Sequence, residues 1–476
     1  MAAAAATFVL CGGCRIGNSG NAIPSPFPFW SDLIIETRKR GFPDFVKLHA
    51  QHGPLFYWRF LGPRKLFVGS FEAVKQLLGP WGMVNISGKQ HARVKRLAQA
   101  AFTPRAIRGY LPRMQTIAEQ AVQKWAADGD ILWFTFRIAV EIIVGFDDGW
   151  TSPRQFPTIS AEFKTWLEGL FRRVRQQHLD RTRFFPLPIP GTAFARGMKM
   201  RAALMRRIHA SLDLLEERNA AAAAGSPGEA SGHNGDAGSP AAEQRTTLDF
   251  LKSSRDENGN TLTRQAEGTE QIADTVLTLL FAGHDTSSSS LTRIFHHLHN
   301  HPEAAERLRR EQADVVAKHG SVITEAALHD MPYADGVVRE TLRITPIVVG
   351  FSRVALQDFE LCGYTVPAGT GMTCSLAQPL LTDARWQGEE QPLAFKPERW
   401  LAGAALKQGA WIPFGGGQRL CLGWLLAMTE MKVLLAAIFR GHAMELRQPD
   451  EPWVSFPLAR PKCSMPARFV AVKDAE

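Results

Sequence analysis

Residues 411–424 read WIPFGGGQRLCLGW, and this stretch decides both the fold and the chemistry expected of the chain. Its three consecutive glycines, residues 415–417, allow the backbone to turn tightly and to approach a large flat group. Cys421 follows in the same loop, just before an apolar run that predicts a helix over residues 423–440. A helix N-terminus stabilises a thiolate, and backbone N–H groups can donate hydrogen bonds to its sulfur. The stretch therefore favours Cys421 as a metal ligand over the simpler alternative, a buried cysteine beside a glycine turn.

The spacing of five residues in this loop is more specific than the glycines alone. Phe414, Gly417, Arg419, Cys421 and Gly423 fit the pattern F-x-x-G-x-R-x-C-x-G, and the arginine can meet an anion beside the metal. The pattern resembles the cysteine-ligand signature of the cytochrome P450 family. The resemblance implies that the cysteine binds the iron of haem b (iron protoporphyrin IX) and that the other four residues bind the cofactor.

A second motif, AGHDT at residues 282–286, lies inside a long apolar helical run. Gly283 costs a helix about 1 kcal/mol relative to alanine, and this is more easily tolerated where a group must lie against the backbone. Thr286 can donate a hydrogen bond to the Ala282 carbonyl and loosen the helix there. The motif resembles the family's oxygen-activation motif. This implies that Ala282 and Gly283 contact the cofactor and that Asp285 and Thr286 are catalytic, managing protons beside dioxygen; the alternative is a helix with a polar seam.

Three charged residues resemble a structural network of the same family. Glu340 and Arg343 stand at positions i and i+3, which share one face of a predicted helix. Residues 395–400, FKPERW, resemble the family's P-E-R-F segment, which implies that Arg399 completes a buried Glu–Arg–Arg network behind the cysteine loop. Removal of one member would leave a buried charge without its partner, so we expect a structural role.

Haem propionates require cations, and the resemblance assigns three residues to them. Arg353 precedes FELCGYTVPAG, where the family has a propionate-binding arginine. His91 and Lys95 match the family's W/H-x-x-x-R/K pair, with lysine in place of the more usual arginine. Lysine keeps the charge but not the two-pronged geometry of a guanidinium. For all three, the alternative is a solvated surface charge.

The pattern along the chain predicts a mainly α fold, the cytochrome P450 fold, with small β-sheet patches. An early hairpin is expected at Leu55–Phe60 and Lys65–Val68, and short strands within residues 348–375. Helices are expected at residues 31–51, 89–101, 104–126, 133–144, 157–177, 193–219, 266–299, 302–318, 324–329, 333–343 and 423–440.

The domain organisation is expected to be simple. Residues 1–23 are interpreted as a flexible N-terminal leader, either transit-like or the remnant of a longer one. Residues 24–476 form one domain. It is interrupted at residues 220–245 by a low-complexity Ala/Gly/Ser/Pro insertion that is expected to be disordered, because it buries too little apolar area to offset its ordering entropy.

Charge and motif content bear on the partners. The net charge of +9 favours acidic partners, but without a lysine- and arginine-rich block we expect no nucleic acid. No nicotinamide or flavin fingerprint is evident, so the resemblance implies electrons from NADPH through a partner, a reductase or a ferredoxin. The six cysteines are sparse and irregularly spaced, which favours a reducing compartment over a disulfide framework.

The front of the chain leaves the location open. No stretch has the roughly 20 apolar residues that would span a bilayer. Phe27, Phe29 and Trp30 either touch a membrane peripherally or pack in the core. The endoplasmic reticulum membrane surface and the plastid are both possible locations.

The overall resemblance predicts a monooxygenase that inserts one oxygen atom from O2 into a lipophilic substrate. Residues 185–201 and 281–290 resemble the family branch that oxidises sterols, brassinosteroids, triterpenoids and retinoids, which implies an isoprenoid-type substrate. The region 68–91 is shorter than in the family, so the alternative is a catalytically impaired haem protein that acts as a sensor or scaffold. A rearrangement enzyme that uses peroxide is disfavoured, because its relatives usually lack an intact A-G-x-D-T.

Overall fold

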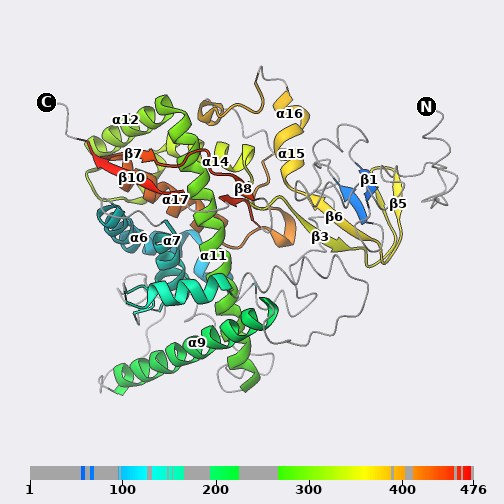
Figure 1. Cartoon of the computed structure of the whole chain (residues 1–476), viewed down its shortest axis with the longest axis horizontal. Coiled ribbons are helices and arrows are strands. Elements are labelled where there is room, and N and C mark those ends of the chain that lie inside the picture. The colour runs from blue at the N-terminus through cyan, green and yellow to red at the C-terminus, as the bar shows by residue number, and fades with distance from the viewer. Residues whose placement is uncertain are drawn as a thin grey trace, which may run out of the picture.

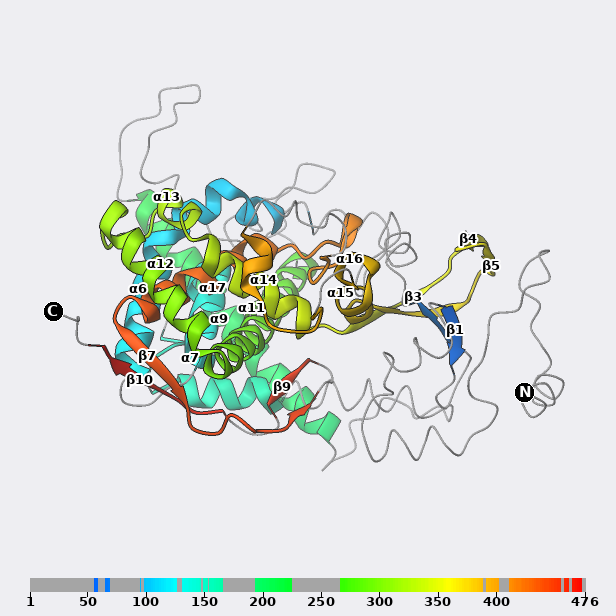
Figure 2. The same cartoon turned by 90° about the horizontal axis from the view of Figure 1, so that it is seen from above.

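Helices gather at one end of the molecule and the largest sheet lies at the other (Figures 1 and 2). The structure is a computed structural model of the whole chain. It describes residues 55–58, 65–68, 95, 98–125, 131–146, 149–152, 154–165, 193–224, 266–387, 391–401, 411–454, 458–461 and 465–472. The leader, Phe27, Phe29, Trp30, His91 and most of the region 68–91 lie outside these residues, so the predictions made for them are not tested.

The helical end contains most of the predicted helices. Its longer members are α6 (Pro104–Trp125), α7 (Ile131–Arg137), α9 (Ala193–Ala224), α11 (Ala266–Asn300), α12 (Pro302–His319), α14 (Pro332–Ile344) and α17 (Trp424–Phe439). Shorter helices are η1 (Ala100–Phe102), α13 (Glu325–His329), α15 (Ala377–Thr382), α16 (Ala384–Gln387), η5 (Pro397–Trp400) and η6 (Gly417–Arg419), and residues 156–165 are also helical. The helices predicted from residue 104 onward are confirmed as far as the described residues reach, although several boundaries shift.

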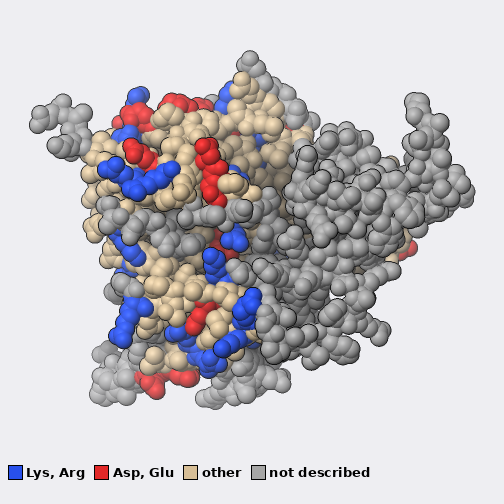
Figure 3. Space-filling view, viewed as in Figure 1, with Lys and Arg blue, Asp and Glu red and all other residues tan. Residues whose placement is uncertain are grey.

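The apolar periodicity explains how these helices pack. In α6, buried residues recur every three or four positions, and this face packs against α17. Helix α11 runs through the middle of the bundle and contacts α7, α9, α14 and α17 (Figure 1). Basic and acidic side chains are interleaved over the described helices on the face shown in Figure 3. The core therefore lies around α11, which carries one of the two predicted site motifs.

Two helical predictions need correction. The stretch predicted as one helix at residues 133–144 is α7 followed by η2 (Ile138–Val144), a π-helical segment. It ends at Gly145, whose positive φ of 93° allows its N–H to reach the Val140 carbonyl at 2.9 Å. The predicted insertion began at residue 220, but α9 continues to Ala224 because alanine has the highest helix propensity.

The sheet end is built around the predicted hairpin. Strands β1 (Leu55–Trp58) and β2 (Lys65–Val68) pair antiparallel. On its other edge β2 pairs parallel with β6 (Gly371–Ser375), and β6 pairs antiparallel with β3 (Gly350–Val354). A second hairpin joins β4 (Phe359–Leu361) to β5 (Tyr364–Val366) through two residues of positive φ, Cys362 and Gly363. These strands confirm the predicted β patches.

Sequence patterns missed the β structure near the C-terminus. Strand β7 (His442–Leu446) pairs with β10 (Ala467–Ala471), and β8 (Trp453–Val454) pairs with β9 (Arg460–Pro461). Neither pair consists of two runs of alternating apolar and polar residues joined by a short glycine-containing turn, which is the pattern that identifies a hairpin. Within the part of the chain that the structure describes, no helix is both long and apolar enough to cross a membrane.

Candidate haem site

The glycine loop places Cys421 between η6 and the start of α17. Gly415 and Gly417 have positive φ values of 75° and 62°, so a residue with a side chain would be strained at either position. The loop closes on itself because the Cys421 N–H donates to the Phe414 carbonyl at 2.9 Å. Gly423 follows as the N-terminal cap of α17 and lies near the ring of Phe102. The backbone therefore holds the thiol at the helix N-terminus that the sequence predicted.

The surroundings of the Cys421 thiol have opposing effects on its pKa. Cys421 is exposed to solvent, but many protein atoms surround its thiol. This desolvation raises the pKa of the thiol. A hydrogen bond from the Gly423 N–H and the positive charge of Lys95 lower it. A metal cation bound to the sulfur would favour the thiolate further, since a metal deprotonates a coordinating thiol.

The predicted cations Lys95, Arg419 and Arg353 are linked to the Cys421 thiol by successive electrostatic effects. Burial and, to a smaller extent, the charge of Arg419 lower the pKa of Lys95. Burial and, to a smaller extent, the charge of Arg353 lower the pKa of Arg419 to about 10. Lys95 therefore lies within electrostatic range of Cys421 and of Arg419, and Arg419 lies within range of Arg353. Positive charges held together in this way fit a group that carries carboxylates beside its metal, as haem does.

The AGHDT motif lies in the middle of α11. The Thr286 hydroxyl donates to the Ala282 carbonyl at 2.6 Å, which is the hydrogen bond predicted from the sequence, and the Ala282 side of the helix is exposed. Burial raises the pKa of the Asp285 carboxyl to about 6, and the charge of Arg460 on β9 opposes this rise. Asp285 can therefore gain and lose a proton near neutral pH, as a proton carrier must.

Gly283 lies where α11 packs closely on η2. A Cβ atom at this position would lie 2.5 Å from Cδ1 of Ile143, in the π-helical η2. The absent side chain thus permits close packing of α11 on η2. A contact between Gly283 and a cofactor remains a prediction.

The predicted charged network is present and buried. Arg343 donates twice to the Glu340 carboxylate, at 2.9 Å each, and Arg399 Nε donates to the same carboxylate at 2.9 Å. Two donors that the sequence analysis did not name complete the set: the indole of Trp400 at 3.0 Å and the backbone N–H of Lys396 at 3.2 Å. Glu340 and Arg343 have no exposed side-chain area. The network joins α14 to η5 and has the form expected of a structural element.

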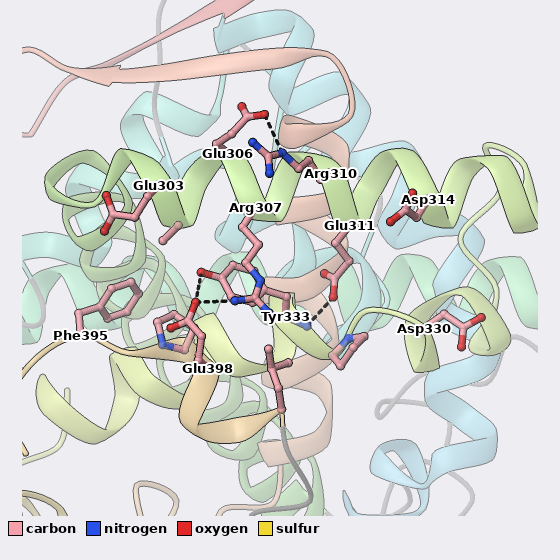
Figure 4. Close-up of a pocket in the computed structure, with 14 residues that line it drawn as sticks. Glu303, Glu306, Arg307, Arg310, Glu311, Asp314, Asp330, Tyr333, Phe395 and Glu398 are labelled. Carbon is pink, nitrogen blue, oxygen red and sulfur yellow. Dashed lines mark hydrogen bonds and ion pairs between the residues drawn. The ribbon is translucent and has the colours of Figure 1, made fainter. Parts of the chain in front are cut away.

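A groove of about 880 Å3 lies on the outer side of this network, between α12, α14 and η5 (Figure 4). Glu398 accepts hydrogen bonds from Arg307 at 3.0 Å and from the Tyr333 hydroxyl at 3.1 Å, and Glu311 receives the first backbone N–H groups of α14. These polar groups satisfy one another within the groove. None of the predicted site residues lines the groove, so the groove is distinct from the candidate haem site.

Two further contacts of α11 were missed by the sequence analysis. His284 Nδ1 lies 2.9 Å from the hydroxyl of Thr135 on α7, and the hydroxyl of Ser287 donates to Glu430 on α17. Both partners are far away in sequence, so no local pattern identifies them. Among the residues that the structure describes, no group of three or more His, Cys, Asp or Glu side chains is placed to hold a metal ion.

Comparisons with known proteins find similarities over most of the chain. The sequence profile of the family described as Cytochrome P450 matches residues 79–467. A putative cytochrome P450 120 from Synechocystis is 27% identical over 83% of this chain and 84% of its own length. The cholesterol 22-hydroxylase CYP90B27 of Paris polyphylla is 28% identical over 85% and 77%. A solved structure, retinoic acid bound cyanobacterial CYP120A1, superposes with a TM-score of 0.69 at 26% identity and covers 92% of this chain and 96% of that one.

Proposed function

The chain belongs to the cytochrome P450 family and is a monooxygenase, and from that premise we propose that it binds haem b through Cys421 and oxidises a lipophilic, isoprenoid-type substrate. The observation that carries the proposal is the Cys421 thiol, held at the N-terminus of α17 by a glycine loop. The charge of Lys95 acts on this thiol, Arg419 lies near Lys95, and Arg353 lies near Arg419.

Residues of the loop and the sheet have separate tasks toward the cofactor. Cys421 holds the iron, and the N–H of Gly423 hydrogen-bonds its sulfur and tunes it. Arg353 on β3, Arg419 on η6 and Lys95 bind the propionate carboxylates, with His91 as a fourth candidate. When bound, the haem supplies the activation of dioxygen and the transfer of one oxygen atom to a C–H bond.

Residues of α11 would handle protons beside the cofactor. The Thr286 hydroxyl donates a hydrogen bond to the Ala282 carbonyl, and these two polar groups can order a water molecule. Asp285, with a pKa near 6, takes protons from solvent and passes them toward Thr286. General acid–base catalysis of this type contributes about 100-fold to 10,000-fold to a rate.

The substrate class is supported by two similarities, one local and one over most of the chain. Residues 185–201 and 281–290 resemble the branch of the family that oxidises sterols and retinoids. The relatives include a cholesterol 22-hydroxylase and a structure that contains retinoic acid. Sterols and retinoids are both isoprenoid-derived, rigid and apolar, so we propose a substrate of that type without assigning its site of oxidation.

Electrons are proposed to come from NADPH through a separate reductase or ferredoxin. The net charge of +9 favours a partner with an acidic face. Peripheral contact with a membrane through Phe27, Phe29 and Trp30, at the endoplasmic reticulum or in a plastid, remains a proposal for the front of the chain.

The proposed activity is tested with haem-loaded protein, a P450 reductase and NADPH. Retinoic acid and cholesterol serve as probe substrates, and products are separated by mass. A product heavier than either probe by one oxygen atom, labelled when 18O2 is supplied, supports the proposal. Haem binding without NADPH-dependent oxygen consumption would instead favour the sensor or scaffold alternative.

A further inference from the structure

Helix α11 is held on one face by two contacts that flank its catalytic pair. His284 and Ser287 stand at positions i and i+3 and therefore lie on one side of the helix. Ala282 and Thr286 stand at i and i+4 on the opposite side. Whatever fixes the first face sets the direction in which the second face points.

The His284 contact is buried and selective. Its imidazole lies 2.9 Å from the Thr135 hydroxyl of α7 and meets the rings of Phe136 and Phe163 edge to face, with centroids 5.3 and 6.5 Å away. Burial lowers the pKa of His284 to about 4, so the ring is neutral at physiological pH and keeps one nitrogen as an acceptor. The adjacent Gly283 packs on Ile143, which adds a steric contact on the same side.

The Ser287 contact links the two site helices directly. Glu430 lies on α17, the helix that begins at the cysteine loop, and it accepts a hydrogen bond from Ser287 on α11. Both side chains are buried. Burial raises the pKa of Glu430 to about 8, so a neutral acid, and not a carboxylate, makes this contact near pH 7.

We propose that Thr135 and Glu430 are positioning residues, which hold His284 and Ser287 and thereby fix the rotation of α11 that points Asp285 and Thr286 toward the cofactor. The inference rests on the proposed function of Asp285 and Thr286 but concerns residues that never touch the haem. A neutral anchor is sufficient at Glu430, and a hydroxyl is required at position 135.

Amide hydrogen exchange of the whole chain tests the proposal most directly. The variants are Thr135→Val and Glu430→Leu, with Glu430→Gln as the conservative replacement. Thr341→Val is the matched control, because that threonine is buried and bonds within its own helix at 2.8 Å. We expect exchange of residues 282–290 to rise about fivefold in the first two variants, the effect of losing one buried hydrogen bond. It should not rise in Glu430→Gln or in the control.

A second readout uses haem-loaded protein and imidazole, a small ligand that coordinates haem iron. We expect its dissociation constant, from the shift of the Soret band, to change at least threefold in Thr135→Val and Glu430→Leu only. The proposal is overturned if exchange rises equally along the chain, if residues 282–290 are unaffected, or if glutamine disturbs them as much as leucine does. A failure of the proposed function is separate, since the wild type would then lack the thiolate-type spectrum while the exchange data still stand.

Discussion

Glu430 gives the chain an unusual dependence of stability on pH. Its carboxyl is buried between α17 and α11, and its pKa is raised from an ordinary 4.5 to about 8. In the unfolded chain the group loses its proton above about pH 4.5, whereas in the folded chain it keeps the proton up to about pH 8. Stability from this group is therefore complete at low pH and falls as pH rises between these two values.

The size of the effect follows from proton linkage. Each pH unit inside the interval lowers the free energy of unfolding by about 1.4 kcal/mol, so the change between about pH 5.5 and about pH 7.5 is roughly 3 kcal/mol. Glu430→Gln removes the titration but keeps a neutral hydrogen-bonding group. The variant should thus gain roughly 3 kcal/mol relative to wild type over the same two pH units.

Equilibrium unfolding in urea at several pH values measures this difference. Other groups also titrate in this range. One is His284, whose lowered pKa makes the folded chain less stable on acidification. Those contributions are common to both proteins and cancel in the difference. Ser287→Ala should raise the pKa of Glu430 further, because the serine hydroxyl lowers it. Stability curves for wild type and Glu430→Gln that stay parallel from pH 5.5 to pH 7.5 would refute the reasoning.

Three further predictions concern the two motifs and the charged network. Glu340→Leu removes the carboxylate that pairs with the buried Arg343 and Arg399, and it should lower the free energy of unfolding by about 3–5 kcal/mol, measured in urea; a loss under about 1 kcal/mol contradicts the burial. Gly283→Ala should destabilise the fold by about 1–3 kcal/mol, and Ile143→Val, which removes the clashing methyl group, should relieve it; additive losses would rule out the contact. Asp285→Asn should slow product formation about 100-fold or more and abolish a rate change near pH 6 while haem binding is kept; an unchanged pH profile would exclude this carboxyl as proton carrier.

The sequence alone located the parts of the site that depend on local spacing. Gly415 and Gly417 take positive φ, which favours glycine, so the sequence pattern indicates the geometry of the loop. The Thr286 hydrogen bond follows from an i to i+4 spacing, and the Glu340–Arg343 pair from i to i+3. The helix boundaries followed equally well from apolar periodicity over most of the described chain.

The remaining parts depend on contacts between distant segments. No pattern near His284 or Ser287 indicates that Thr135 and Glu430 lie against them, because those partners come from other helices. The π-helical η2 also escaped prediction, since its apolar residues suit an α-helix as well. The packing of Gly283 on Ile143 could only be found once both helices were placed.

The central claim is that Cys421 binds haem iron as a thiolate. The most direct measurement is the absorbance spectrum of the haem-loaded protein after reduction and exposure to carbon monoxide, for wild type and for Cys421→Ser. We predict a strongly red-shifted Soret band in wild type and its loss in the variant, with haem still bound. A red-shifted band that survives in Cys421→Ser, or a folded wild-type protein that takes up no haem, would contradict the claim.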